Sequence, residues 1–169
     1  MAKARPFISP CLALIMMSIA EPVQVLLVED QATDAHLISR ALDAFNLKAS
    51  TLWLRDGAQA LNYLLDPDAS GNPPNLRHLQ LVLLDVKLPK VDGIEVLRQL
   101  RSGHSTRFVP TVMLTSSQEH RDIASSYLAG ANSYIVKPVD FDEFIKTISA
   151  VIAYWTRLNL TPEGHVQSL

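Results

Sequence analysis

Short, continuously apolar segments alternate with helical patterns along most of this chain. The apolar segments lie at 23–28, 49–54, 79–84, 109–114 and 133–136, and the helical patterns at 34–45, 57–65, 93–101, 121–128 and 141–155. A strand that is apolar on both faces is typical of a parallel sheet covered by helices on both sides. The sequence therefore predicts an α/β fold, with a doubly wound five-stranded parallel sheet and helices on both faces.

Polar or charged residues follow four of the five predicted strands. Glu29 and Asp30 follow the first strand, and Asp85 follows the third. Thr115 follows the fourth strand and Lys137 the fifth. Because the carboxyl ends of parallel strands meet at one edge of the sheet, where ligands bind in such folds, we expect these side chains to converge there.

These residue types suit phosphoryl transfer to a carboxylate. Clustered carboxylates repel one another, and a hard divalent cation such as Mg²⁺ relieves that repulsion. Asp85 would then act as a nucleophile and take a phosphoryl group as an aspartyl phosphate. Lys137 would place a positive charge on a phosphate oxygen, and Thr115 would donate from its hydroxyl.

Each residue also has an ordinary structural explanation. Glu29 and Asp30 could be acids favoured at a helix N-terminus, and Thr115 could be a helix N-cap. Lys137 could be a surface lysine. Asp85 is the hardest to explain in this way, since an acid at the end of so apolar a strand is costly without a function. Their occurrence together at the strand ends favours the functional interpretation.

Four segments at the strand ends resemble the receiver domains of two-component response regulators. These segments are Val25 to Asp30, Leu83 to Pro89 with Asp92-Gly93, Leu114 to Ser116, and Tyr134 to Pro138. The resemblance covers roughly residues 23–154 and implies the flavodoxin-like receiver fold. It also implies a protein that is phosphorylated by a histidine kinase and signals through a changed surface.

The resemblance implies roles for the acidic residues and their neighbours. Asp85 would be the phosphoacceptor, and Asp30 and Asp85 would bind Mg²⁺ directly. The backbone carbonyl of Lys87 would be the third protein ligand, and Glu29 would act through a bound water. Lys87 and Ser117 occupy the positions that tune the lifetime of the phosphoryl group in the family.

The same resemblance implies a phosphate-binding pair and a switch pair. Lys137 and Thr115 would bind the phosphoryl group, and Pro138 follows Lys137 with a peptide bond that is cis in the family. Thr115 and Tyr134 would form the switch, in which the hydroxyl moves onto the phosphoryl group and the ring turns inward.

A finer resemblance points to one group of receivers. The long segment at 66–78, the run at 55–61 and the run at 141–144 are similar to the single-domain regulators that partner bacterial phytochrome histidine kinases. A regulator that serves another hybrid kinase would look much the same. The expected partner is therefore a histidine kinase, with the phytochrome type as the closer match.

Composition and charge narrow the remaining classes of partner and location. The formal net charge is −2 and basic residues are not clustered, so a nucleic-acid partner is not expected. A single cysteine allows no internal disulfide and fits a reducing, cytoplasmic location. Residues 1–21 have the outline of a secretory signal, but their apolar run is too short to span a bilayer, and we interpret them as a non-essential extension. Residues 22–156 form the receiver and 157–169 a tail, so no enzymatic output module is expected.

The last predicted helix carries an apolar stripe that is wider than one core-facing side needs. Because no output domain is expected, we expect the protein to act through a surface, as a homodimer through Ile148, Ile152 and Trp155. The alternative is that Trp155 folds back onto its own domain.

Other functional classes remain as alternatives. A phosphatase of the haloacid dehalogenase kind would need a second aspartate where Lys87 stands. A dinucleotide-binding domain would need glycines where Glu29, Asp30 and Gln31 follow the first strand. A degenerate receiver that acts only as a protein scaffold is the remaining alternative, and the intact acidic set argues against it.

Overall fold

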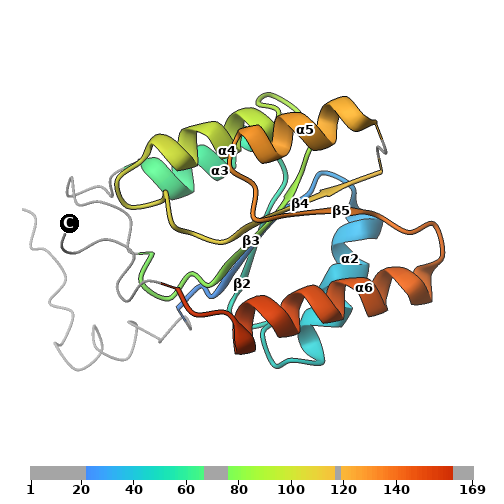
Figure 1. Ribbon diagram of the computed structural model, residues 1–169. Coiled ribbons are helices and arrows are strands. Elements are labelled where there is room, and N and C mark those ends of the chain that lie inside the picture. The colour runs from blue at the N-terminus through green and yellow to red at the C-terminus, as the bar shows by residue number, and fades with distance from the viewer. Residues whose placement is uncertain (1–21, 67–75, 117–118, 162–169) are drawn as a thin grey trace, which may run out of the picture.

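The fold is built on a single sheet of five parallel strands, seen in a computed structural model that describes residues 22–66, 76–116 and 119–161 (Figure 1). The strands lie in the order β2-β1-β3-β4-β5, and the direction of winding reverses between β1 and β3. Such a reversal opens the sheet edge where ligands bind in doubly wound folds. The strands are β1 (Val25–Val28), β2 (Thr51–Leu54), β3 (Leu81–Asp85), β4 (Thr111–Thr115) and β5 (Ser133–Val136).

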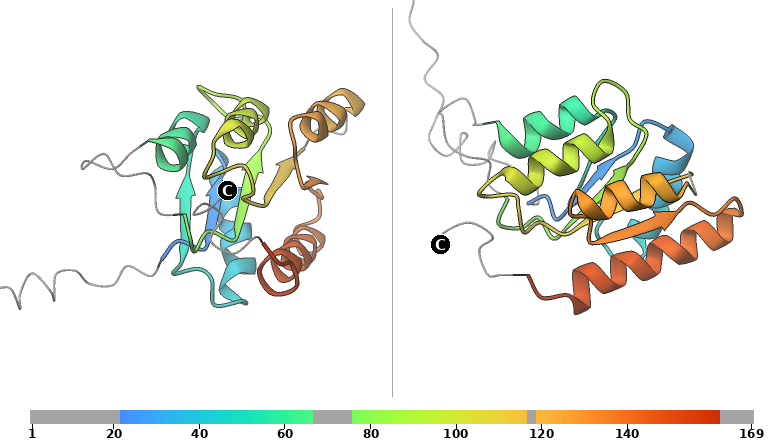
Figure 2. Two further views of the ribbon diagram at one scale, coloured as in Figure 1. Left: turned by 60° about the vertical axis from the view of Figure 1, so that its left-hand side comes forward. Right: turned by 45° about the horizontal axis from the view of Figure 1, so that its top comes forward.

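Helices cover both faces of this sheet (Figures 1 and 2). One face is covered by α2 (Ala32–Asp43) and α6 (Phe141–Ala153), which pack side by side. The other face is covered by α3 (Gly57–Leu65), α4 (Gly93–Ser102) and α5 (His120–Leu128). This arrangement confirms the predicted fold class, a doubly wound parallel sheet between two helical layers.

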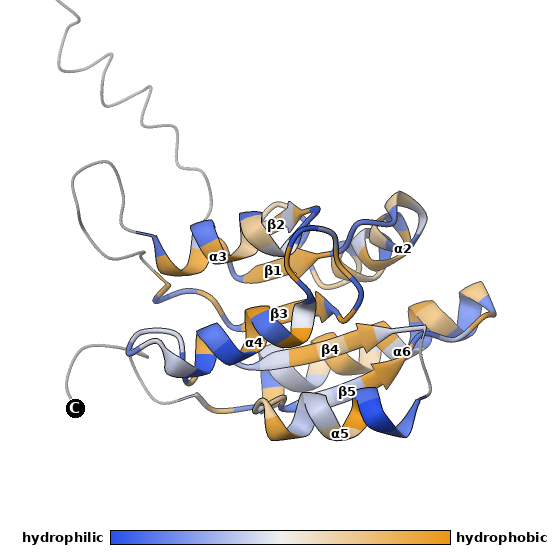
Figure 3. Ribbon diagram, turned by 90° about the horizontal axis from the view of Figure 1, so that it is seen from above, coloured by the Kyte–Doolittle hydropathy of each residue, from blue (hydrophilic) through white to orange (hydrophobic). Residues whose placement is uncertain are grey.

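The strands supply both halves of the core because successive side chains point to opposite faces. Val25 and Leu27 of β1 pack toward α2 and α6, whereas Leu26 and Val28 pack toward α3 and α4. All four are almost completely buried. Figure 3 shows the consequence, with mostly hydrophobic strands and helices that carry hydrophobic and hydrophilic sides.

The strand boundaries differ from the sequence prediction in a regular way. The first four strands begin two residues later than predicted. Residues just before them still bond across the sheet, as the backbone N–H of Gln24 donates to the carbonyl of Ser50 at 2.8 Å. Asp85 and Thr115 are the last residues of β3 and β4 and do not lie beyond them. The final helix ends at Ala153 and continues as a π-helical turn, η1 (Tyr154–Leu158).

The structure corrects the predicted dimer surface on α6. Ile148 and Ile152 are fully buried within one chain, where they pack with Val112 and Leu114 of β4. They cannot also serve as contacts between chains without opening the core. Trp155 is half-buried against the same cluster and meets Tyr154 edge to face, with ring centroids 5.0 Å apart. The wide apolar stripe is therefore mostly explained by the sheet and by α2.

None of the helices in the described ranges is both long enough and apolar enough to cross a bilayer.

Candidate functional site

Three carboxylates gather at the carboxyl edge of the sheet, where β1 and β3 lie side by side. Carboxylate oxygens of Glu29, Asp30 and Asp85 all lie within 4.8 Å of one another. Glu29 and Asp85 are buried, and Asp30 is exposed. The grouping expected from the sequence is therefore present. A set of carboxylate oxygens fits a hard divalent cation such as Mg²⁺, which prefers oxygen ligands.

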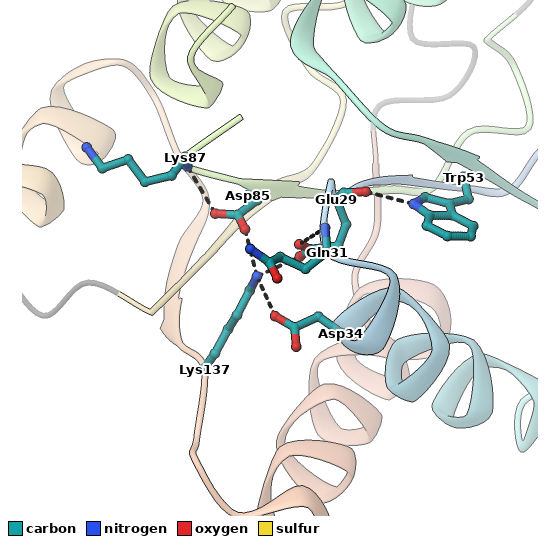
Figure 4. A network of polar contacts seen from close by, with 7 residues as sticks. All are labelled: Glu29, Gln31, Asp34, Trp53, Asp85, Lys87 and Lys137. Atoms are coloured by element: carbon teal, nitrogen blue, oxygen red, sulfur yellow. Dashed lines mark hydrogen bonds and ion pairs between the residues drawn. The ribbon is translucent and has the colours of Figure 1, made fainter. Parts of the chain in front are cut away.

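The ammonium group of Lys137 lies at the centre of the acidic residues (Figure 4). Its Nζ donates to Oε2 of Glu29 at 2.6 Å, to Oδ2 of Asp85 at 2.6 Å and to Oδ2 of Asp34 at 2.9 Å. Only 7% of the Lys137 side chain is exposed. Because an ammonium group has three hydrogens, these three contacts use its full donor capacity.

Burial and neighbouring charges shift the pKa values of Glu29 and Lys137. Burial raises the pKa of Glu29 to about 7, and the attraction of Lys137 offsets only part of that rise. Burial also lowers the pKa of Lys137, but the charges of Asp85 and Glu29 outweigh burial and raise it above its ordinary value. Lys137 is therefore a permanent positive charge among carboxylates.

Both oxygens of Asp85 accept hydrogen bonds from the protein. Oδ2 accepts from Lys137, and Oδ1 accepts from the backbone N–H of Lys87 at 3.0 Å. The side chain of Lys87 points away and approaches the carboxylate of Asp122 in α5 at 3.6 Å. The backbone of Lys87 thus lies beside the acidic group, while its role as a carbonyl ligand stays a prediction.

The start of α4 packs directly on the end of β3. The backbone N–H of Gly93 donates to the carbonyl of Val86 at 2.9 Å. A Cβ at position 93 would overlap the carbonyl oxygen of Asp85 and lie 3.0 Å from its carbonyl carbon. Asp92 caps the helix by accepting from the N–H of Ile94 at 2.9 Å. Glycine therefore lets the helix approach the backbone of the acidic residue.

Thr115 and Tyr134 contact each other next to the acidic group. Thr115 is fully buried at the end of β4, and its carbonyl accepts from the N–H of Lys137 at 2.7 Å. Burial raises the pKa of the Tyr134 hydroxyl, and a hydrogen bond with the side chain of Thr115 offsets part of that rise. The two predicted switch residues are thus joined in this structure.

The expectations for Ser117 and for the peptide bond before Pro138 are not confirmed. Ser117 lies outside the described residues. None of the described peptide bonds is cis, so the expected cis bond before Pro138 is wrong for this structure.

Two residues of the site escaped the sequence interpretation. Asp34 lies in the first turn of α2 and binds Lys137. The spacing of three acids in the segment from Glu29 to Asp34 was the available signal. Trp53 of β2 donates from its indole Nε1 to the carbonyl of Glu29 at 2.8 Å, and no sequence pattern points to that contact.

Comparison with known proteins identifies the family. A sequence model of the response regulator receiver domain matches residues 25–149. The chain belongs to this family. Its relatives include the probable methanogenesis regulatory protein FilR2 of Methanothrix harundinacea, which is 39% identical over 84% of this chain and 89% of its own length.

Solved receiver structures resemble the fold closely. The phosphorylated cyanobacterial phytochrome response regulator RcpA has a TM-score of 0.73 at 30% identity, over 84% of this chain and 99% of that one. The Mn²⁺-bound form of Rcp1, from Synechocystis, also has a TM-score of 0.73 at 30% identity, over 83% of this chain and 99% of its own. The receiver fold and the resemblance to phytochrome regulators follow from these matches.

Proposed function

We propose that this receiver accepts a phosphoryl group on Asp85 from a histidine kinase. The observation that carries the proposal is the 2.6 Å contact between Asp85 and Lys137 within a buried group of carboxylates. An oxygen of Asp85 forms the bond to phosphorus as the P–N bond to the kinase histidine breaks, and the imidazole nitrogen keeps the electron pair. Positioning and charge neutralisation are the main contributions of a protein to such a transfer.

The acidic residues would hold a divalent cation, taken to be Mg²⁺. Asp30 and Asp85 would be direct ligands, the carbonyl of Lys87 a third, and Glu29 would act through water. When bound, the cation neutralises charge on the incoming phosphoryl oxygens. The Mn²⁺-bound form of the related Rcp1 supports a divalent cation in this family.

Lys137 and Thr115 would bind the phosphoryl oxygens once Asp85 is modified. Lys137 already contacts Oδ2 of Asp85, so its ammonium needs only a small movement to reach a phosphoryl oxygen. Thr115 would exchange its hydrogen bond with Tyr134 for one with the phosphoryl group. The ring of Tyr134 would then be free to turn, which would change the surface formed by β5 and α5.

The proposed partner is a histidine kinase of the phytochrome type, supported by the likeness to RcpA and Rcp1. We propose a cytoplasmic location, a signalling role without turnover of small molecules, and receiver bounds of residues 22–156. A homodimer remains part of the proposal, with Trp155 as the one predicted contact that is not fully buried. A scaffold that works without phosphorylation is the alternative, and the complete acidic site argues against it.

Phosphoryl uptake tests the proposal directly. The full chain is incubated with Mg²⁺ and an acyl phosphate, and the protein mass is compared with that of Asp85→Asn. We expect the unmodified chain to gain one acid-labile phosphoryl group and the variant to gain none. Equal labelling of both proteins would assign the acceptor elsewhere, and labelling of neither would favour the scaffold alternative.

A further inference from the structure

Lys137 divides its three hydrogen bonds between two kinds of carboxylate. Glu29 and Asp85 belong to the group of three whose oxygens lie within 4.8 Å of one another. Asp34 contacts the same ammonium at 2.9 Å but lies outside that group. It reaches Lys137 from a separate element, the first turn of α2 (Figure 4).

The two kinds of partner differ in whether they remain available to Lys137. Glu29 and Asp85 are also the carboxylates that would interact with a divalent cation. The charge of that cation competes with Lys137 for the same oxygens. Asp85 in addition loses its negative charge at the attacking oxygen when that oxygen bonds to phosphorus. Asp34 takes part in neither event. Its side chain is 30% exposed and remains within hydrogen-bond distance of Nζ.

We propose that Asp34 is the positioning residue for Lys137 in the phosphorylated receiver. It holds the ammonium group in place when Glu29 and Asp85 bind the cation or the phosphoryl group, so that Nζ is already oriented toward the phosphoryl oxygens. This inference rests on the proposed phosphorylation of Asp85. It adds a residue of α2 to a site otherwise formed at the ends of the strands.

The long flexible stem of lysine explains why such an anchor matters. A free lysine side chain has many rotamers, and fixing them in one geometry costs conformational entropy. The contact with Asp34 restricts Nζ before the phosphoryl group arrives, so less side-chain entropy is lost when Lys137 binds the phosphoryl oxygens. Because Asp34 is partly exposed, its effect is smaller than that of a fully buried charge partner. We expect a change of about three- to tenfold when it is removed.

The test compares Asp34→Asn with Asp43→Asn, a matched control. Asp43 is an exposed acid at the end of the same helix, and the structure shows no contact between its carboxylate and Lys137. Both variants lose one negative charge from α2. We expect Asp34→Asn to take up phosphoryl groups from an acyl phosphate about three- to tenfold more slowly and to bind beryllofluoride, a phosphoryl mimic, more weakly by a similar factor. Asp43→Asn should match the unmodified chain.

Calorimetry with Mg²⁺ separates positioning from metal binding. Asp34→Asn should change Mg²⁺ affinity by less than about threefold, because Asp34 lies outside the acidic group. A loss of Mg²⁺ affinity as large as the loss of uptake would overturn the positioning role and make Asp34 part of the cation site.

A double-mutant cycle tests whether Asp34 acts through Lys137. In a Lys137→Ala background, Asp34→Asn should have no further effect on beryllofluoride affinity. An effect of undiminished size in that background overturns the inference. If Lys137→Ala does not fold, Asp34→Glu replaces it and should recover at least half of the lost uptake, and an uptake no better than that of Asp34→Asn overturns the inference.

The controls also separate this inference from the proposed function. If the unmodified chain takes up no phosphoryl group and binds no beryllofluoride, the proposed function fails and the inference fails with it. If the unmodified chain does both and Asp34→Asn behaves as Asp43→Asn does, only the inference fails.

Discussion

Replacing Gly93 by alanine should disturb Asp85 without touching any side chain of the site. The new Cβ would overlap the carbonyl oxygen of Asp85 and would lie 3.0 Å from its carbonyl carbon and 3.1 Å from Cα of Val86. All three atoms belong to the backbone, so none can rotate away as a flexible side chain would. Either α4 must move outward or the end of β3 must move inward.

The size of the effect follows from the cost of overpacking. Inserting a methyl group into a well-packed region costs about 1–3 kcal/mol, and a backbone neighbour places Gly93→Ala in the upper part of that range. The reduced entropy of the unfolded chain returns about 0.4–1 kcal/mol. We therefore expect a net loss of about 2 kcal/mol of unfolding free energy and a melting temperature lower by roughly 4–8 °C.

Thermal unfolding and phosphoryl uptake from an acyl phosphate measure the two consequences. Uptake should fall with stability, because the atoms that must move carry the Asp85 carboxylate. Arg98→Ala is the control, since Arg98 is an exposed residue of the same helix and forms a surface ion pair with Glu95. Its effect should stay within about 0.5 kcal/mol. If Gly93→Ala melts and takes up phosphoryl groups as Arg98→Ala does, the junction of β3 and α4 is not rigid and the reasoning is refuted.

Three further predictions concern the metal, the loop after β3 and the assembly. Asp30→Ala should weaken Mg²⁺ binding by at least tenfold in calorimetry while the fold is kept, because Asp30 is exposed, and equal affinity would remove it from the cation site. Asp56 caps α3 and binds Lys90 at 2.6 Å, and the hydrogen bond from Lys90 holds its pKa below the usual value. A carboxyl group whose pKa is lower in the folded chain stabilises the fold at a pH above its unfolded pKa of 3.8, and this contribution is lost as the pH falls through the folded pKa. Asp56→Ala should therefore lower the melting temperature by a few degrees at pH 7 and by less below pH 3.8. Sedimentation at micromolar concentration should show a dimer that Trp155→Ala weakens, and an unmodified chain that is monomeric with and without beryllofluoride contradicts the proposed homodimer.

The sequence was sufficient for the parts of the fold that depend on local periodicity. A strand such as β3 is apolar at every position before its acidic end, and that pattern predicts burial on both faces and a polar group at the sheet edge. Because Glu29, Asp30 and Asp85 lie at strand ends, the sequence predicted that they are close together before any distance was known. The order of elements alone therefore located the candidate site.

The missed features depend on contacts between distant residues. Asp34 and Lys137 are 103 positions apart, and no periodic pattern connects them. Ile148 and Ile152 were wrongly assigned to a dimer surface, because a sequence shows how many apolar residues a helix has but not that both β4 and α2 pack against it. Ile148 and Ile152 needed the packing of the whole layer to be placed in the core.

Lys137 gives this chain a built-in counter-ion. Carboxylates that would repel one another in an empty site are held together by an ammonium group of the same molecule, through contacts of 2.6 to 2.9 Å. We therefore expect this receiver to fold before any cation is bound. Removal of Mg²⁺ by a chelator should then stop phosphoryl uptake without unfolding the protein, and uptake should resume when Mg²⁺ is added back.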